Sequence, residues 1–318
     1  MPIPADRARG AFLGLALGDA WGQPLEFIRG HRVRTQPVSL EPGVFRWTDD
    51  THMALFLAEA VLSLEPGPLD EDHFGTAVGE HWLRWLHDPL TPSTAPGNSC
   101  LRGMRRYEAG RDWRRSGDPR TDGCGAVMRI APLAMAFEGA SLTRAAQVQA
   151  LITHAHPNAI EAAVAACHML RWTLEHGRFD GEVVLRAVSK LRGAWARGGV
   201  VAEALLAAMD FTAHPGQAWL DEPSIPTGDG GWRSASALGL SVAAALYWGF
   251  DFFTAVDRAA RIDGDSDSVA CLAGMFLGAA GGTAVLPAPW LEVLPERGRL
   301  AALADRLVSW EQAACSGA

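Results

Sequence analysis

The chain is almost devoid of lysine. Lys190 is the only lysine among its 28 basic residues, and all the others are arginine. Acidic residues number 36, so the formal net charge is -8. A negatively charged surface is repelled by polyanions, which argues against a general nucleic-acid binder or a protein that binds anionic membranes. We therefore expect no general nucleic-acid binding and no membrane partner.

Cysteine is scarce and is nowhere spaced as a CxxC pair. The five cysteines are Cys100, Cys124, Cys167, Cys271 and Cys315. An odd and scattered set predicts neither a disulfide framework nor a zinc site, and reduced thiols are typical of the cytoplasm. The apolar run after the basic start of the chain is interrupted by Asp19, so it does not read as a signal peptide. The expected location is the cytoplasm.

Runs of alternating, β-branched residues are also missing, so few strands are expected. Apolar residues at helical spacing cover most of the chain instead. The predicted helices span about 5–21, 49–63, 71–86, 126–138, 142–153, 158–176, 181–197, 199–209, 233–248, 251–260 and 266–280. Loops are predicted at 36–47, 88–99, 115–125 and 214–232. With no repeat and no clear linker, residues 1–318 are predicted to form a single all-α domain.

Glycine is patterned in two of these helices. Residues 269–291 carry no charge and are long enough to cross a bilayer, but they contain four glycines and two prolines. They therefore predict a buried helix of about four turns followed by a loop. In the first helix a glycine recurs at every fourth position, at Gly10, Gly14, Gly18 and Gly22. Such a stripe predicts close packing against another backbone.

Two acidic clusters each precede an apolar helical run. In "WTDD", Thr48 is suited to an N-cap and Asp49 and Asp50 follow in the first turn. In "DGDSDS" (263–268), three aspartates fall within five positions. Acidic residues favour any helix N-terminus, and for either cluster alone that explanation stays open. Two such clusters in one chain favour a shared site for a hard cation, because carboxylate and hydroxyl oxygens suit Mg²⁺, Mn²⁺ or Ca²⁺.

Simple templates for such a site do not match. An EF-hand loop from Asp263 requires Gly at its sixth position and Glu at its twelfth, where Ser268 and Gly274 stand. The DDxxD pattern of helical prenyl-diphosphate enzymes requires an acid where Met53 stands. The histidines of "THAHP" (153–157) follow a helical run, whereas the HxH of amidohydrolases ends a barrel strand.

Six segments carry a resemblance to a known family. They are "GAFLGLALGDAWGQPLEF" (10–27), "WTDDTHMAL" (47–55), "APGNSCLRGM" (95–104), "GCGAVMRIAPLA" (123–134), "THAHPNAIEAA" (153–163) and "DGDSDSVACLAGMFLGA" (263–279). In their order and spacing the chain resembles the ADP-ribosylglycohydrolase family, which includes dinitrogenase-reductase-activating glycohydrolases and ADP-ribosyl-acceptor hydrolases. The resemblance implies a compact, orthogonal multi-helical domain with a dinuclear metal site at helix N-termini.

The resemblance also implies the residues that hold the metals. Two Mg²⁺ ions, with Mn²⁺ as an alternative, would be bound by Thr48, Asp49, Asp50, Asp265, Asp267 and Ser268. Many relatives have Thr where Ser268 stands, and both residues supply a hydroxyl. Asp263 is often Gly in relatives and is expected outside the ligand set. Glu26 matches a mobile acidic residue near the metals, so the implied catalytic residues are Glu26, Asp50 and Asp265.

Substrate contacts follow from the same resemblance. The turn in "DGCGAVMR" (122–129) matches the family's diphosphate-binding turn, and a helix is expected to begin immediately after it. Relatives commonly have Asn where Cys124 stands. His156 is expected to cap the turn before Pro157. Trp232 is expected either to contact the adenosine or the distal ribose, or to be a buried structural residue. The implied substrate-binding residues are Asp122, Gly123, Cys124, Gly125, His154 and Trp232.

The implied function is metal-dependent hydrolysis of the glycosidic bond between ADP-ribose and an acceptor, which is a modified protein side chain or a small conjugate. The metals would bind the distal ribose and activate water. Two alternatives stay open: a non-catalytic ADP-ribose-binding or crystallin-like relative, and another helical magnesium-dependent diphosphate enzyme. The acceptor is left open among arginine, serine, a nucleic-acid base, O-acetyl-ADP-ribose and other conjugates. The chain is expected to act as a monomer.

Overall fold

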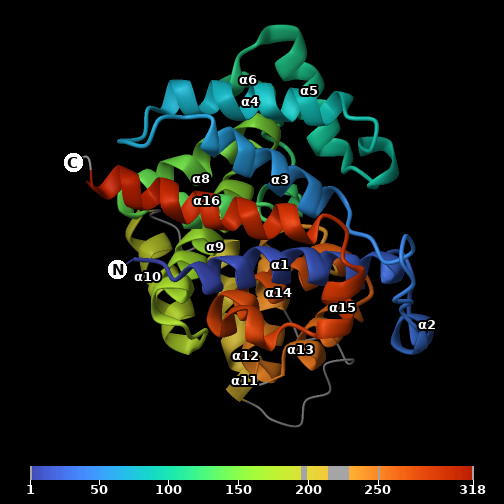
Figure 1. Cartoon of the computed structure of the whole chain (residues 1–318). Coiled ribbons are helices and arrows are strands. Elements are labelled where there is room, and N and C mark those ends of the chain that lie inside the picture. Colours follow the sequence, from blue (N-terminus) through green and yellow to red (C-terminus); the bar gives the residue numbers. More distant parts are fainter. Residues whose placement is uncertain (1, 195–198, 214–228, 250, 317–318) are drawn as a thin grey trace.

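The computed structural model describes residues 2–194, 199–213, 229–249 and 251–316, and no β-strand occurs among them (Figure 1). The all-α class is therefore confirmed. The α-helices are α1 (Ala5–Gly22), α2 (His31–Thr35), α3 (Asp49–Leu62), α4 (Glu71–His87), α5 (Asn98–Gly110), α6 (Trp113–Ser116), α7 (Ala131–Ala136), α8 (Gly139–Thr153), α9 (Pro157–His176), α10 (Gly181–Ala194), α11 (Val200–Ala213), α12 (Ser234–Trp248), α13 (Phe252–Ala260), α14 (Ser266–Gly281), α15 (Ala288–Val293) and α16 (Arg297–Ser316). Short 3-10 helices are η1 (Gln23–Leu25), η2 (Thr91–Ser93), η3 (Cys124–Ala126) and η5 (Gly282–Val285).

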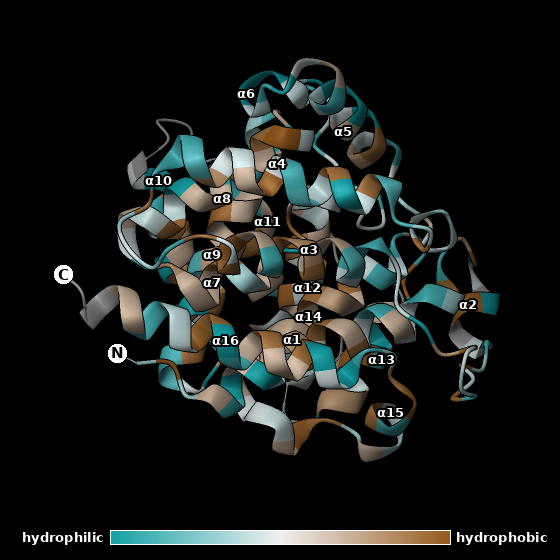
Figure 2. Cartoon of the chain, turned by 45° about the horizontal axis from the view of Figure 1, so that its top comes forward, coloured by the Kyte–Doolittle hydropathy of each residue, from teal (hydrophilic) through white to brown (hydrophobic). Residues whose placement is uncertain are grey.

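Helix α14 lies at the centre of the molecule. It packs against α1, α9, α12 and α13, and its residues 266–279 are all buried. In Figure 2 these central helices are largely apolar, whereas the outer faces of α5, α6 and α10 are more hydrophilic. Within the described part of the chain, Ser266–Val285 is long and apolar enough to cross a membrane, and most of it is buried inside the fold. The predicted buried core helix is thus confirmed.

Helices α1 and α14 pack backbone against backbone along the glycine stripe. A Cβ added to Gly14 would overlap the carbonyl oxygen of Gly274, and one added to Gly10 would overlap that of Gly278. At the other end, a Cβ on Gly22 would overlap the backbone of Asp267. The helices are therefore antiparallel, and the C-terminal end of α1 meets the N-terminal end of α14. The predicted close backbone packing is confirmed.

Several predicted boundaries were wrong. The helix predicted at 126–138 is shorter, because residues 127–129 form a turn and α7 begins only at Ala131. The loop predicted at 88–99 ends at α5, whose sparse apolar residues gave a weak periodic signal. Helix α16 was not predicted, although Leu300, Leu303 and Leu307 follow helical spacing. The predicted loop at 214–232 is described only from residue 229.

We expect Gly14→Ala to destabilise the protein severely. Overpacking a core costs about 1–3 kcal/mol, and here the added methyl group meets a backbone carbonyl that no rotamer change can move. The matched control is Gly298→Ala in α16, where an added Cβ meets no atom within 4 Å. Urea unfolding of both variants should show a loss of about 3 kcal/mol for Gly14→Ala and little change or a slight gain for the control. Equal effects would mean that the helices are not in backbone contact.

Candidate metal centre and substrate site

The two acidic clusters open into one pocket. It has a volume of about 360 Å³, within the range of small-molecule sites, and its acidic lining comprises Glu26, Asp49, Asp50, Asp265 and Asp267. Ser268 and His154 also line it, together with the turn at 123–125, the start of α5 and Trp232. The structure therefore brings residues from the ends of α1, α3 and α14 to one place, as the shared-site hypothesis requires.

The N-terminus of α3 is held by Asp19, which the sequence analysis did not select. This fully buried carboxylate accepts hydrogen bonds from the backbone N–H of Thr48 (2.8 Å), the N–H of Thr51 (3.0 Å) and the Thr51 hydroxyl (2.6 Å). Thr48 itself is the N-cap, and its Oγ1 accepts from the Asp50 N–H at 3.4 Å. Thr48 does not line the pocket; it orients the helical turn that carries Asp49 and Asp50.

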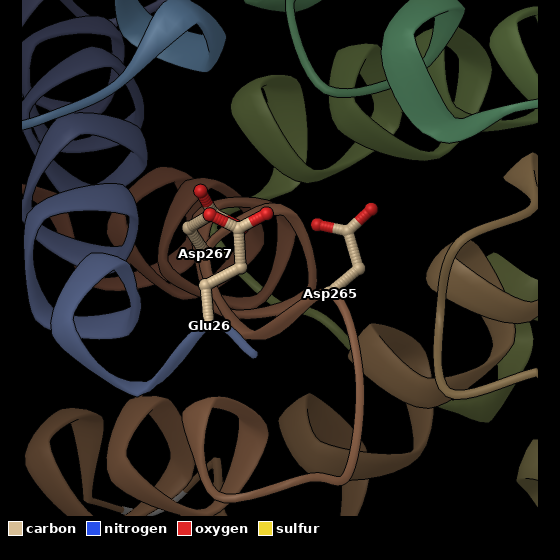
Figure 3. Close-up of side chains that lie close together, drawn as sticks. All are labelled: Glu26, Asp265 and Asp267. Carbon is tan, nitrogen blue, oxygen red and sulfur yellow. The ribbon is translucent and has the colours of Figure 1, made fainter. Parts of the chain in front are cut away.

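The N-terminus of α14 supplies the second set of oxygens. The Asp265 N–H donates to the carbonyl of Gly230 at 2.8 Å, and Asp267 Oδ1 accepts from the Ser268 N–H at 3.0 Å. One ligand atom each from Glu26, Asp265 and Asp267 lies within 4.8 Å of the others. Figure 3 shows that the three carboxylates face the same space, with Glu26 beside Asp267. Glu26, which follows η1, is thus brought directly to the α14 cluster.

Burial raises the pKa of every acidic side chain in this pocket, and repulsion between the carboxylates adds to the rise for most of them. Burial is the main cause for Glu26, whose pKa rises to about 9, and for Asp49, whose pKa rises to about 8; the charge of Asp267 contributes to both. The pKa values of Asp50 and Asp265 are raised for the same two kinds of reason. Burial also raises the pKa of Asp267, and hydrogen bonds from its neighbours oppose that rise. Ionising these groups together therefore requires positive charge among them.

The donor set fits a hard divalent cation. Asp50 Oδ2 is buried and has no hydrogen-bond partner within the described ranges, which is costly unless a cation or a water occupies the space beside it. Oxygen ligands from carboxylates and a hydroxyl are those that Mg²⁺ and Mn²⁺ prefer. Five of the six predicted ligands line the pocket, where a cation would stabilise the carboxylates, and Thr48 does not line it.

Two neighbouring residues support the α14 cluster from outside. Asp263 is exposed and accepts from the Gly30 N–H at 2.6 Å, so it ties the segment after Glu26 to the start of α14. The Cys124 thiol donates to Asp265 Oδ2 at 2.8 Å. A side-chain role for Cys124 thus exists although relatives commonly have Asn there. It orients one carboxylate oxygen of a predicted ligand.

The predicted diphosphate turn differs from expectation. Only the 3-10 helix η3 follows Gly123, so the helix expected to begin immediately is absent from these residues. The Cys124 N–H donates to the Trp232 carbonyl at 3.1 Å, whereas no partner is found for the amides of Gly123 and Gly125 in the part of the chain described. The turn therefore offers two backbone donors. Asp122 does not line the pocket, because its side chain pairs with Asn158 (3.4 Å) and Arg233 (3.8 Å).

Some of the predicted histidine and aromatic residues line the pocket, and others stabilise the helices around it. His154 is buried and lines the pocket, whereas His156 caps α9 by accepting from the Asn158 N–H at 3.2 Å, as expected. Half-buried Trp232 lines the pocket and stacks on Phe27 with ring centroids 5.4 Å apart. Phe27 was not predicted. It is 70% exposed and adopts a φ of 65°, which is rare for an aromatic residue.

The chain is similar to known proteins along almost its whole length. The ADP-ribosylglycohydrolase family model matches residues 1–316. The chain is 31% identical over 319 residues to ADP-ribosylarginine hydrolase Tri1 of Serratia proteamaculans, covering 95% of this chain and 79% of that protein. It is 29% identical to ADP-ribosyl-dinitrogen reductase glycohydrolase of Rhodospirillum rubrum, covering 92% of each. A solved structure described as an ADP-ribosylglycohydrolase-related protein complex matches with a TM-score of 0.73 and 27% identity, covering 96% of this chain and 98% of that one.

The raised pKa values predict how stability responds to pH without divalent cations. The contribution of these carboxyls to the free energy of unfolding is fully present below their pKa in the unfolded chain, about 4. It is lost as the pH rises through their pKa in the folded protein, which is about 7 for Asp19, 8 for Asp49 and 9 for Glu26. In EDTA, the melting temperature should therefore fall between pH 5 and pH 9. Excess Mg²⁺ or Mn²⁺ should raise it more at the higher pH, because the ions bind the ionised carboxylates.

Two variants test whether this response comes from the pocket. Asp50→Asn removes one buried charge, so it should weaken both the fall with pH and the gain from cations. Asp305→Asn removes a surface carboxylate that pairs with Arg9 and should behave as the wild type does. A melting temperature that ignores EDTA at every pH would contradict a cation site at these residues.

Proposed function

The chain belongs to the ADP-ribosylglycohydrolase family, and from this premise we propose that it hydrolyses the N-glycosidic bond between ADP-ribose and an arginine side chain at a dinuclear magnesium centre. The family and its hydrolase relatives indicate an enzyme with ADP-ribosyl glycohydrolase activity. The single observation that supports the metal-dependent chemistry best is the convergence of Glu26, Asp265 and Asp267 beside the aspartates of α3.

The reaction requires positive charge near the distal ribose. Glycosidic cleavage passes through an oxocarbenium-like transition state, and the attacking water must lose a proton. When bound, divalent cations would supply the charge that orients the vicinal ribose hydroxyls and lowers the pKa of the attacking water, so that it loses its proton more readily. The chain's own part is to hold that charge with Asp49, Asp50, Asp265 and Asp267, two of which lie at the N-terminus of each of two buried helices.

Glu26 is the proposed proton carrier. Its carboxyl reaches the acidic cluster, yet it belongs to the segment after η1 rather than to a long helix. As the bond forms between the water oxygen and C1, the anomeric carbon of the distal ribose, a carboxylate oxygen of Glu26 accepts a proton from the water. As the bond from C1 to guanidine nitrogen breaks, the same proton is returned to that nitrogen, so the products are neutral ADP-ribose hydroxyl and free arginine.

Two observations support arginine as the acceptor. One relative is named as an ADP-ribosylarginine hydrolase, at 31% identity over most of this chain. Beside Glu26, the stacked rings of Phe27 and Trp232 present flat aromatic surface at the edge of an acidic pocket. A planar guanidinium group is attracted both by aromatic faces and by carboxylates. A serine or acyl acceptor is neutral, so it would be attracted neither to the aromatic faces nor to the carboxylates in this way.

The proposed reaction is tested with a panel of defined ADP-ribosyl conjugates, on arginine, on serine and as the O-acetyl ester. We expect release of ADP-ribose from the arginine conjugate with Mg²⁺ and none with EDTA. Asp50→Ala and Asp267→Ala should each abolish release, and the double variant should be no worse, because the ligands act as one unit. Small and additive losses would show that the clusters do not share a site, and cleavage of another conjugate alone would reject the arginine assignment.

Glu26→Gln should separate chemistry from binding. General acid–base catalysis contributes roughly 100- to 10,000-fold, so turnover should fall by about that factor while ADP-ribose binds with near wild-type affinity. Calorimetry with ADP-ribose and a single-turnover assay measure the two quantities. The control is Glu41→Gln, an exposed glutamate outside the pocket that should change neither. Unchanged turnover in Glu26→Gln would remove the proton-transfer role.

A further inference from the structure

The two ring nitrogens of His154 have different surroundings. His154 ends α8 as its C-cap residue, is only 2% exposed and lines the pocket. Its Nδ1 lies 2.8 Å from the hydroxyl of Thr153, on the side of the protein interior. Its Nε2 lies toward the turn, 3.4 Å from where a Cβ of Gly123 would stand, and has no hydrogen-bond partner in the ranges described. Which nitrogen carries the proton decides what the pocket presents to a ligand.

A buried arginine lies behind Thr153. Arg129 is fully buried, and its Nη2 donates to Thr153 Oγ1 at 2.7 Å while its Nε donates to Gln149 Oε1 at 3.0 Å. Its guanidinium also stacks over Trp82, with 3.8 Å between the guanidinium carbon and the ring centroid. No ion pair of Arg129 occurs among the described residues. Its hydrogen bonds all go to neutral groups, so it is positioned by shape rather than by one carboxylate.

The hydrogen bonds around Thr153 favour one assignment of protons. A guanidinium group can only donate, so Thr153 Oγ1 accepts from Arg129. The Thr153 oxygen could accept a second bond with its other lone pair, but the buried hydroxyl hydrogen would then have no acceptor among the described residues. Donation of that hydrogen to His154 Nδ1, 2.8 Å away, satisfies it. Nδ1 is then an acceptor and carries no proton. The imidazole proton of a neutral His154 therefore lies on Nε2.

We infer that Arg129 and Thr153 are positioning residues that hold His154 as the neutral Nε2–H tautomer, so that the pocket presents a directed N–H donor to a ligand oxygen. The neighbouring glycine amides at 123 and 125 point to the same use, because they too are donors without partners among the residues described. The identification of that oxygen as part of ADP-ribose rests on the proposed function. The proton assignment itself does not.

Two further features concern the charge of the His154 ring and the turn that faces it. Burial lowers the pKa of His154 to about 3 and the charge of Arg129 adds to the effect, so the ring is neutral and only one nitrogen is protonated. The same arginine fixes the amide of Gln149, whose Nε2 donates to the Ala126 carbonyl in η3 at 2.8 Å. Arg129 thereby orients both His154 and the turn that faces it. Neither Thr153 nor Gln149 lines the pocket.

The tautomer is measured by proton–nitrogen correlation NMR on the full chain with nitrogen-15-labelled histidine, with His154→Gln used to assign the ring signals. We expect the wild type to show an unprotonated Nδ1 and a protonated Nε2 for His154. Thr153→Val removes the hydroxyl with little change of volume, so the tautomer should become mixed and ADP-ribose affinity should fall about tenfold. Thr153→Ser, which keeps the hydroxyl, should restore both properties.

The outcomes separate the two hypotheses. A wild-type His154 protonated on Nδ1 would overturn the inference, and this measurement holds even if Thr153→Val does not fold. A folded Thr153→Val with the wild-type tautomer and full affinity would also overturn it. If the wild type has the expected tautomer but does not bind ADP-ribose with Mg²⁺, the proton assignment stands and the proposed function fails.

Discussion

Backbone contact between α1 and α14 determines where the acidic residues can meet. Because glycines face each other along the two helices, no side chain separates them, and the antiparallel register places Gly22 against the backbone of Asp267. The segment that follows α1 then leaves the core beside the first turn of α14. Glu26 lies four residues after Gly22, and so its carboxyl reaches Asp265 and Asp267. The cluster is a consequence of helix packing and not of one local sequence motif.

The packing must also hold together charges that repel one another. Glu26, Asp49 and Asp19 all have raised pKa values, chiefly because they are buried, so the pocket opposes its own ionisation. The fold tolerates this because the large apolar core around α14 supplies stability that the acidic residues do not. Arg129 contributes positive charge to the same region, and its own pKa is lowered to about 10 mainly by burial. Such opposition between stability and function is typical of active sites.

Much of the arrangement of helices could be predicted, because it follows from local patterns of residue spacing. Helical spacing located α1, α3 and α14, and the Thr-Asp-Asp start of α3 was read correctly as a capped N-terminus. The buried hydrogen bonds between different helices could not be predicted from such local patterns. Asp19 appears in the sequence only as a charge inside an apolar, glycine-striped helix, and its bonds to Thr48 and Thr51 exist only once α1 and α3 have packed.

The turn at 123–125 shows the opposite error. Its glycines and the apolar residues after it suggested an immediate helix, but local spacing cannot show that residues 127–129 form a turn before α7. The positions of protons are even harder to predict from sequence patterns than the boundaries of helices. The tautomer of His154 depends on Arg129 and Thr153, which are 25 and 1 residues away along the chain and adjacent only in the folded protein.

The glycine stripe also limits how the molecule can move. Glycines recur every fourth residue, so the next register that sets glycine against the facing backbone lies four residues away, a slide of about 6 Å at 1.5 Å per residue. Smaller slides would drive side chains into backbone, and a full step would break the hydrogen bonds from Thr48 and Thr51 to Asp19. Helices α1 and α14 therefore act as a rigid frame of fixed length. A change in the shape of the pocket must therefore come from lining segments outside these two helices, among them residues 26–27 and 95–99.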